Sequence, residues 1–365
     1  MNRYMDDTDF NALNNHLVDV NGNEYSAKDY LVKFDEGMNK QIDRKMFPRS
    51  YEFPTGVQFE LTYKCNHRCI HCYNQSGGNH EEKEMTLEQW KKLSHRLGEL
   101  GIFQCVISGG EPTLLKESLF EIMDILDNYS VKFIFISNGL ILNKEYVKKL
   151  SKYKYTWFQI SIDGSRPELH NYVRGLDSWN QAINAANLIK RAGLPLVISH
   201  AVVKKNYDYL EEMIDMSYLL GARRIITGPF SYSGRALING KELELSTDEK
   251  ENVYEIVAKK SKEYKGRMEV IASAEEVIGL RIKQKDVNGV ILIRPNGDVK
   301  IDCVAPFKIG NVLEEDIYSI WNRIGRNVWE HPRVVEYINS IHSSDDLRCV
   351  YPRINVDPDE LLVNI

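Results

Sequence analysis

The chain has few cysteines, no long apolar stretch and no export signal, and each of these absences excludes a class of protein. Only 6 of its 365 residues are cysteine, which excludes a disulfide-rich secreted scaffold. No apolar run approaches the roughly 18 residues that a membrane-spanning helix needs. The first ten residues, MNRYMDDTDF, are acidic and lack the basic and apolar regions of a signal peptide. We therefore expect a cytoplasmic protein.

Charge and composition limit the partners further. The net charge of −5 is modest, and no basic patch with interleaved aromatic residues is visible, so nucleic acid is not expected as a substrate. We find no internal repeat and no low-complexity tract. With 365 residues and a hydrophobic fraction of 43%, the chain can build one large core and an extension.

Three of the six cysteines lie close together in the segment ELTYKCNHRCIHCYN, residues 60–74. Cys65, Cys69 and Cys72 follow a strand-like apolar run and are separated by three and then two residues. Three thiolates can bind three corners of a [4Fe–4S] cube, whereas clusters that only carry electrons usually have four cysteines. The spacing therefore predicts a cluster with one open iron, the arrangement of a metal site that does chemistry.

Two other uses of these cysteines are weaker. A structural zinc ion would need a fourth ligand, for which His67, His71 and His80 are candidates. A disulfide is disfavoured because the chain is cysteine-poor and has no export signal. We therefore interpret the three cysteines as ligands of an iron–sulfur cluster.

The cysteine loop resembles that of the radical S-adenosylmethionine (SAM) family, with His71 in the place before the third cysteine that is usually aromatic. The resemblance covers about residues 55–236. It implies that SAM binds the open iron of a [4Fe–4S] cluster held by Cys65, Cys69 and Cys72. It also implies that one electron cleaves SAM and that the resulting radical removes a hydrogen atom from a substrate.

Short apolar runs alternate with helical patterns after residue 55. The runs are β-branched and aromatic, as in parallel strands that are buried on both faces. Thr86 with Gln89, and Ser178 with Gln181, mark two helix starts as capping boxes. Six such units predict an α/β fold whose parallel sheet is open or partly closed, and the resemblance implies a partial (β/α)6 barrel of the TIM type. The predicted strands are 56–63, 102–108, 131–137, 157–162, 194–203 and 223–228.

Small and polar residues follow the ends of these strands, where ligands bind in parallel α/β folds. Taken singly, Gly-Gly, Asn-Gly and Asp-Gly pairs are more often turns than ligands. Their recurrence at successive strand ends favours a binding site. The resemblance implies that the amine of SAM binds at Gly109, Gly110, Glu111 and Pro112. It places the ribose at Ser137 and Asn138, and the carboxylate at Ser161 and Arg174, beside Asp163. The adenine would lie against Val202.

The sequence divides into three parts. Residues 1–54 are polar and shorter than the complete leader-binding domain of peptide-modifying relatives, so we interpret them as padding over the barrel, with a lid or a truncated leader-binding segment as alternatives. Residues 55–240 form the predicted core. They end near GPFSYSGRA, residues 228–236, which resembles the loop that closes the core in peptide-modifying members. Residues 241–365 form a C-terminal extension.

The extension resembles the start of a SPASM or twitch domain, a small α+β cap. Residues 291–321 predict a hairpin with a turn at Pro295-Asn296-Gly297-Asp298, and then a helix from near Glu314. Such caps often bind auxiliary iron–sulfur clusters in relatives. Here only Cys303 and Cys349 are available.

Two thiolates cannot hold a four-thiolate cluster, so we expect that the auxiliary cluster has been lost. The alternative is a cluster completed by His331, His342 or a substrate thiol. The remaining cysteine, Cys105, lies within a predicted strand and is expected to be a small buried hydrophobe.

The resemblance favours an enzyme that modifies a ribosomally made peptide, by a thioether or C–C cross-link or by epimerisation. One alternative keeps the radical chemistry but changes the substrate to a small molecule, such as a sugar, a nucleoside or a porphyrin precursor. Another is a non-catalytic zinc or iron–sulfur binding module. The expected electron donor is a flavodoxin or a ferredoxin, and no membrane partner is expected.

Overall fold

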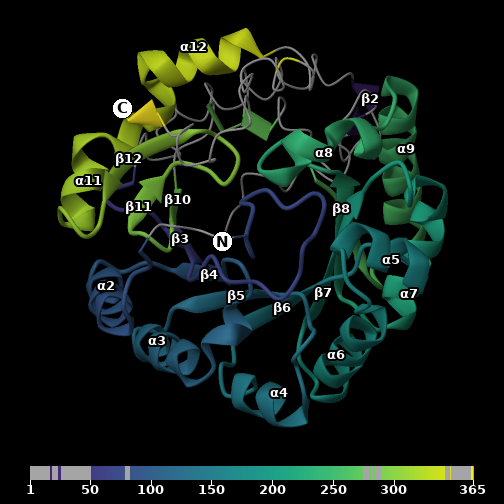
Figure 1. Cartoon of the computed structure of the whole chain (residues 1–365), viewed down its shortest axis with the longest axis horizontal. Coiled ribbons are helices and arrows are strands. Elements are labelled where there is room, and N and C mark those ends of the chain that lie inside the picture. The colour runs from purple at the N-terminus through teal and green to yellow at the C-terminus, as the bar shows by residue number, and fades with distance from the viewer. Residues whose placement is uncertain are drawn as a thin grey trace.

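A twisted, mostly parallel sheet curves around the centre of the protein, and helices cover its outer face (Figure 1). Among the residues described, this sheet has 11 strands in the order β13-β12-β11-β10-β3-β4-β5-β6-β7-β8-β9. The computed structural model describes residues 51–78, 83–273, 279–280, 283–284 and 289–341, together with 17–18, 24–25, 346 and 363–364.

The six predicted strands are confirmed, and they lie side by side in chain order with parallel register. Two further strands extend the parallel sheet at its edges, because β9 (Glu269–Ala272) pairs with the last of the six and β10 (Val290–Ile293) with the first. The parallel sheet thus continues past residue 240. The six strands are β3 (Gly56–Glu60), β4 (Gln104–Ser108), β5 (Lys132–Ser137), β6 (Thr156–Ser161), β7 (Leu196–Val202) and β8 (Arg224–Pro229).

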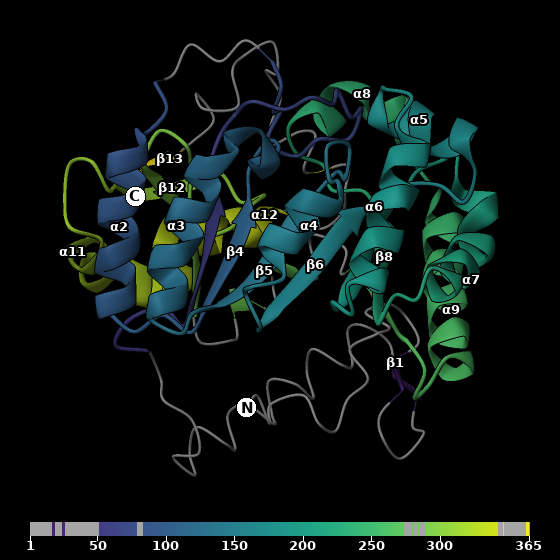
Figure 2. The ribbon, with the colours of Figure 1, turned by 90° about the horizontal axis from the view of Figure 1, so that it is seen from below.

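Most of the connecting helices pack on the outside of the sheet, as Figure 2 shows at 90° to the view of Figure 1, whereas α5 (Pro167–Arg174) and α8 (Arg235–Leu243) lie against the cysteine loop. The outer helices bury one apolar face against the sheet and so cover the outer side of the strands. This is the curved parallel sheet of a partial TIM-type barrel. The outer helices are α2 (Leu87–Glu99), α3 (Glu117–Asn128), α4 (Lys144–Leu150), α6 (Trp179–Arg191), α7 (Leu210–Leu219) and α9 (Thr247–Glu263), with 3-10 turns η2 (Pro112–Leu115) and η3 (Tyr207–Tyr209).

One predicted capping box is confirmed and the other is wrong. At the start of α2, the Thr86 hydroxyl accepts from the Gln89 amide while the Gln89 side chain accepts from the Thr86 amide. Ser178 stands at the N-cap of α6 but makes no such bond, because its hydroxyl pairs with the His170 ring at 3.1 Å. Asn171 caps α6 instead, since its side-chain oxygen Oδ1 accepts from the main-chain amides of Ser178 and Trp179.

The core lies between the sheet and these helices. Phe59 on β3 is fully buried, and its ring centroid lies 4.9 Å from that of Trp90 on α2. Cys105 on β4 has no exposed surface, so its prediction as a small buried hydrophobe is confirmed. In the described part of the chain, no helix is long and apolar enough to cross a membrane.

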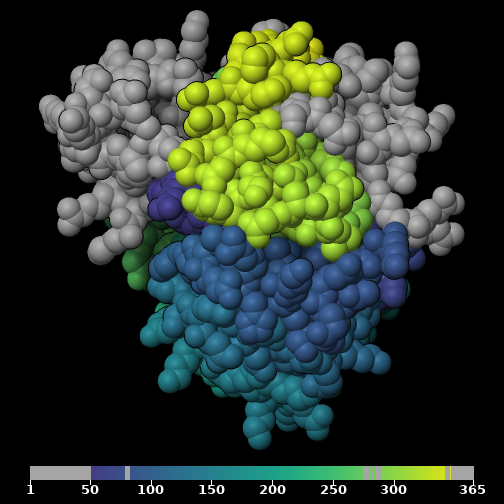
Figure 3. Space-filling view, turned by 90° about the vertical axis from the view of Figure 1, so that its left-hand side faces the viewer, coloured from purple at the N-terminus to yellow at the C-terminus, as the bar shows by residue number. Residues whose placement is uncertain are grey.

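The C-terminal segment continues the sheet beyond β10. The predicted hairpin is confirmed: β10 pairs antiparallel with β11 (Asp298–Lys300), and Gly297 has a φ of +91° in the turn between them. Figure 3 shows this segment, in yellow and light green, packed on the blue region that includes α2. The Arg96–Asp316 ion pair (2.8 Å) joins the two. The remaining elements are β12 (Phe307–Asn311), α11 (Ile317–Arg323), η4 (Gly325–Glu330), α12 (Pro332–Ser340) and β13 (Val363–Asn364).

At the other end, β1 (Leu17–Val18) and β2 (Glu24–Tyr25) pair antiparallel. Most of residues 1–54 lie outside the described residues, so their role as padding stays a prediction. The division of the chain into 1–54, 55–240 and 241–365 also stays a prediction.

Candidate active site

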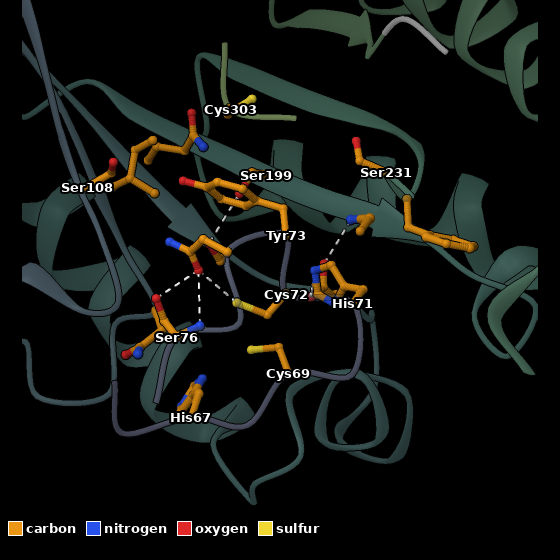
Figure 4. Close-up of a pocket in the computed structure, with 18 of the residues that line it drawn as sticks. His67, Cys69, His71, Cys72, Tyr73, Ser76, Ser108, Ser199, Ser231 and Cys303 are labelled. Carbon is orange, nitrogen blue, oxygen red and sulfur yellow. Dashed lines mark hydrogen bonds and ion pairs between the residues drawn. The ribbon is translucent and has the colours of Figure 1, made fainter. Parts of the chain in front are cut away.

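A cavity of about 370 Å³ lies at the carboxyl ends of the parallel strands (Figure 4). The three cysteines of the loop after β3 line it, and so do most of the strand-end residues that the sequence singled out. Parallel strands bring their carboxyl ends to one edge, which explains why residues so far apart in the chain meet here. The predicted residues on the cavity wall are Cys65, Cys69, Cys72, Gly109, Gly110, Glu111, Ser137, Asn138, Ser161, Asp163 and Arg174.

The structure does not bring every predicted residue to this wall. Pro112 is buried as the first residue of η2, and Val202 is fully buried in the core at the end of β7. Neither lines the cavity. His331 caps α12, where its Nδ1 accepts from the Arg333 amide. His80, His342 and Cys349 lie outside the described residues.

Gly109 and Gly110 are glycines because the chain is crowded there. A Cβ on Gly110 would lie 2.1 Å from the carbonyl oxygen of Lys64, and a Cβ on Gly109 would lie 2.9 Å from the Leu61 nitrogen. The Gly110 amide donates to the Thr62 carbonyl at 2.6 Å. The close approach that these glycines permit is therefore to the start of the cysteine loop, which the Gly-Gly turn holds against β4.

Glu111 organises the neighbouring strand end. Its carboxylate is buried and accepts from the Ser137 hydroxyl (2.9 Å), the Asn138 amide (2.8 Å) and the Thr113 amide (3.1 Å). The Asn138 side chain in turn donates to Asn66 in the cysteine loop at 2.7 Å. This network fixes Ser137 and Asn138 on the cavity wall.

Asp163 and Arg174 form a buried ion pair beside the cysteines. The Asp163 carboxylate lies 2.6 Å from Arg174 Nε and 3.8 Å from His71 Nε2. Burial alone would raise the pKa of Asp163, but Arg174, followed by His71 and His200, lowers it to about 2. Asp163 is therefore ionised, and Arg174 remains a cation in the cavity wall.

Sequence reasoning missed the residues that tie the loop after β8 to the cysteine loop. Arg235 donates to the carbonyls of Cys69, Gln75 and Ser76 at 2.8 to 2.9 Å. Gly234 has a φ of +56°, and a Cβ there would lie 2.4 Å from the Cys72 carbonyl oxygen. The signal was present in GPFSYSGRA. Its glycine permits a close approach of two backbone segments, and the arginine that follows can donate several hydrogen bonds.

Other missed residues face the cavity from inside the strands. Gln58, Gln159 and His200 are polar positions within otherwise apolar runs, and that interruption was the signal. Tyr73 lies in the cavity between the cysteine loop and Cys303 (Figure 4), and its hydroxyl donates to buried Glu60 at 2.7 Å. Cys303 brings the C-terminal segment to the same wall.

The donor set fits an iron–sulfur cluster better than a single ion. Ligands of one zinc ion converge within about 2.0–2.3 Å of it. Among the described residues, no three His, Cys, Asp or Glu side chains are placed to hold one metal ion in this way. Each cysteine of a cube binds a separate iron, so its sulfurs need not converge. Both ring nitrogens of His67 are buried on this wall and have no hydrogen-bond partner in the described part of the chain, as a group that faces a ligand would.

Comparison with known proteins agrees with this geometry. Residues 59–217 match the model of the Radical SAM superfamily. The mycofactocin maturase MftC of Mycolicibacterium smegmatis is 28% identical over 312 residues, which cover 82% of this chain and 76% of that protein. A PqqA peptide cyclase of Streptomyces rochei is 28% identical over 276 residues, which cover 73% of this chain and 75% of that protein.

Solved structures share the fold. Streptococcus suis SuiB bound to S-adenosylmethionine superimposes with a TM-score of 0.65 over 93% of this chain and 83% of that one, at 15% identity. Native anSMEcpe with bound AdoMet has a TM-score of 0.59 over 75% of this chain and 82% of that one, at 17% identity. At these identities the likeness is one of fold.

Proposed function

The chain carries a radical SAM domain and is a SAM-dependent enzyme with a [4Fe–4S] cluster, and from this premise we propose that it modifies a ribosomally made peptide. The observation that carries the proposal is the cavity in which three closely spaced cysteines meet the ends of the parallel strands. The names of the relatives, a maturase and a peptide cyclase, support a peptide substrate, as does a SuiB structure bound to the precursor peptide SuiA. The alternative of a non-catalytic metal-binding module does not agree with a radical SAM domain whose relatives are enzymes.

Cys65, Cys69 and Cys72 would each hold one iron and leave the fourth open to SAM. When bound and reduced by one electron, the cluster and SAM supply a carbon radical that removes a hydrogen atom from the substrate. The protein's part is to bind, orient and exclude water. Ferredoxin or flavodoxin is the proposed electron donor, and a reducing cytoplasm suits the three thiolates.

The neighbouring residues would orient SAM. In this proposal, the carbonyls of Gly109 and Gly110 accept from its amine, and Ser161 and Arg174 meet its carboxylate. Ser137 and Asn138 meet its ribose. Their fixed positions support these roles, since Glu111 already binds the Ser137 hydroxyl and the Asn138 amide. Groups held in place before the ligand arrives lose less freedom on binding.

The substrate would occupy the other side of the cavity, under the C-terminal segment. Ser231, Ser273, Cys303 and Val304 also line the cavity. None of the four is charged, and the two serines offer hydroxyls to a peptide backbone, whose amides are neutral donors and acceptors. The cap would thus close the open side of the barrel over the reacting residue.

The direct test is turnover with candidate peptides. Anaerobically reconstituted enzyme, SAM and a chemical reductant are incubated with synthetic copies of the short peptides encoded next to the gene. We expect 5′-deoxyadenosine to rise with one of them, and the product to be lighter by two hydrogens or epimerised at constant mass. A rise with a sugar, nucleoside or porphyrin precursor, and with none of the peptides, would transfer the proposal to a small-molecule substrate.

The ligand assignment has its own test. The C65A/C69A/C72A triple variant should bind almost no iron, because the three cysteines are the proposed ligands of the cluster. About four irons remaining per chain would show a cluster elsewhere, and Cys303 would then be its first candidate ligand.

A further inference from the structure

Arg174 contacts both a buried carboxylate and one of the cysteines that are assigned to the cluster. Its Nε lies 2.6 Å from the Asp163 carboxylate, and its Nη1 donates to Cys69 Sγ at 3.7 Å. Arg174 is 9% exposed and Asp163 is fully buried, so water screens neither charge well. The guanidinium thus stands between a carboxylate and a thiol that is assigned to the cluster.

The backbone holds this arrangement in place. The last turn of α5 accepts two hydrogen bonds from the cysteine loop, from the Ile70 amide to the Val173 carbonyl (3.0 Å) and from the Arg68 amide to the Arg174 carbonyl (3.4 Å). Gly175 then leaves the helix at a φ of +67°, where a Cβ would lie 2.6 Å from the Arg68 carbonyl oxygen. The end of α5 and the cysteine loop are therefore packed as one unit.

Asp163 is fixed just as firmly. Its Oδ1 accepts from the Ala201 amide on β7 at 2.8 Å, and its own amide donates to His170 Nδ1 at 3.2 Å. Its Oδ2 therefore faces Arg174, and neither partner can turn away without breaking other bonds. The pair is a built feature of the site, and the proposed function uses only Arg174 of the two, to meet the SAM carboxylate.

We propose that the Asp163–Arg174 pair sets the reduction potential of the cluster, Arg174 raising it and Asp163 lowering it. The proposal rests on the proposed function, because it takes Cys69 as a cluster ligand. Reduction adds one negative charge to the cluster, and a cation donating to a ligand sulfur stabilises the reduced form. A buried anion opposes reduction, and the low dielectric strengthens both effects.

Arg174 can do this and still meet SAM. A guanidinium has five N–H donors, of which one faces Asp163 and one faces Cys69 in this structure. The role in SAM binding and the role in setting the reduction potential can be separated, since the effect on the potential of the cluster exists before SAM binds. The test is therefore made without SAM and needs no peptide.

The experiment is a redox titration, followed by EPR, of the reconstituted full-length enzyme. R174Q should shift the midpoint potential to more negative values, D163N should shift it to less negative values, and the D163N/R174Q double variant should return close to the wild type. R174K keeps the charge and should lie close to the wild type. If R174Q takes up no iron, D163N still tests the pair, because removal of the buried anion must shift the potential to less negative values.

Arg166 supplies a matched control on the same helix. It stands at the N-cap position of α5, makes no side-chain capping bond there, and forms an exposed two-bond pair with Glu212 at 2.8 and 3.0 Å. R166Q also removes one positive charge, but from a solvent-exposed position, so it should leave the midpoint potential of the cluster unchanged.

Two results would overturn the proposal. One is a SAM-free potential of R174Q equal to that of the wild type, even if SAM binding is weakened, because Arg174 would then serve SAM alone. The other is a D163N shift in the same direction as R174Q. Failure of the proposed function looks different, since no peptide would then raise 5′-deoxyadenosine while the SAM-free potentials of the variants would still shift.

Discussion

Arg235 and Cys69 are joined by a hydrogen bond from the guanidinium Nε to the main-chain carbonyl at 2.8 Å. The two residues are 166 positions apart in the chain. Through this bond, and two others to Gln75 and Ser76, the segment after β8 closes over the cysteine loop. The segment that follows the sixth strand of the predicted core thus fixes the cysteine loop, which follows the first strand.

Removing this clamp should loosen the cysteine loop. R235A deletes three hydrogen bonds to carbonyls, so we expect the affinity for the cluster to fall by about 10-fold or more, as with other groups that orient metal ligands. Iron and sulfide content after reconstitution and limited proteolysis within residues 65–78 measure the effect. R267A removes a charge from an exposed surface arginine and should leave both unchanged. Equal iron content in R235A and R267A would refute the clamp.

Adding one methyl group at Gly110 should destabilise the site. The Cβ of G110A would lie 2.1 Å from the Lys64 carbonyl oxygen, so the backbone of one segment must move. Overpacking of this kind costs about 1–3 kcal/mol or more of unfolding free energy. Urea unfolding measures it. G56A is the control, because a Cβ at Gly56 would meet its nearest atom at 3.4 Å.

Acid should destabilise the fold through His200. Burial lowers its pKa to about 4, with Arg174 and His71 adding to the effect and Asp163 opposing it. The folded protein therefore binds fewer protons than the unfolded chain, whose histidine has a pKa near 6.5. Stability is present above that value and falls as pH drops from about 6.5 towards 4. Between pH 7.5 and 5 we expect a loss of about 2 kcal/mol from this residue.

The matched measurement compares wild type with H200Q. A glutamine can still bond with Thr227, which lies 2.7 Å from His200 Nδ1, but it does not titrate. Urea midpoints at pH 7.5 and pH 5 should therefore differ less in H200Q than in the wild type. Identical differences in both proteins would show that His200 is protonated as readily in the folded state as in the unfolded one.

Enlarging Cys303 should obstruct the substrate and spare the cluster. This side chain lines the cavity from the C-terminal segment, across Tyr73 from the cysteine loop (Figure 4). C303F should leave iron content and peptide-free cleavage of SAM unchanged and raise the KM for the peptide. C303A is the size control and should keep iron as well. A loss of iron in both variants would instead identify Cys303 as a cluster ligand.

Much of the fold could be predicted because parallel β–α units leave a strong local pattern. Most positions of the buried strands are apolar, and Thr86 with Gln89 signals a helix start within four residues. The failed box at Ser178 shows the limit of local patterns. Its hydroxyl is taken by His170, which lies eight residues away, and no local rule includes that partner.

The candidate site divides in the same way. By itself the sequence determined that three thiols lie within eight residues after a buried strand, and that small polar residues end the following strands. Only the tertiary structure decided that Gly109 and Gly110 accommodate the backbone of the cysteine loop, that Arg235 clamps that loop, and that Arg174 lies between Asp163 and Cys69. The reason is physical: spacing and hydrophobic pattern are local properties, whereas a carbonyl or a carboxylate acquires its partner only when the sheet closes.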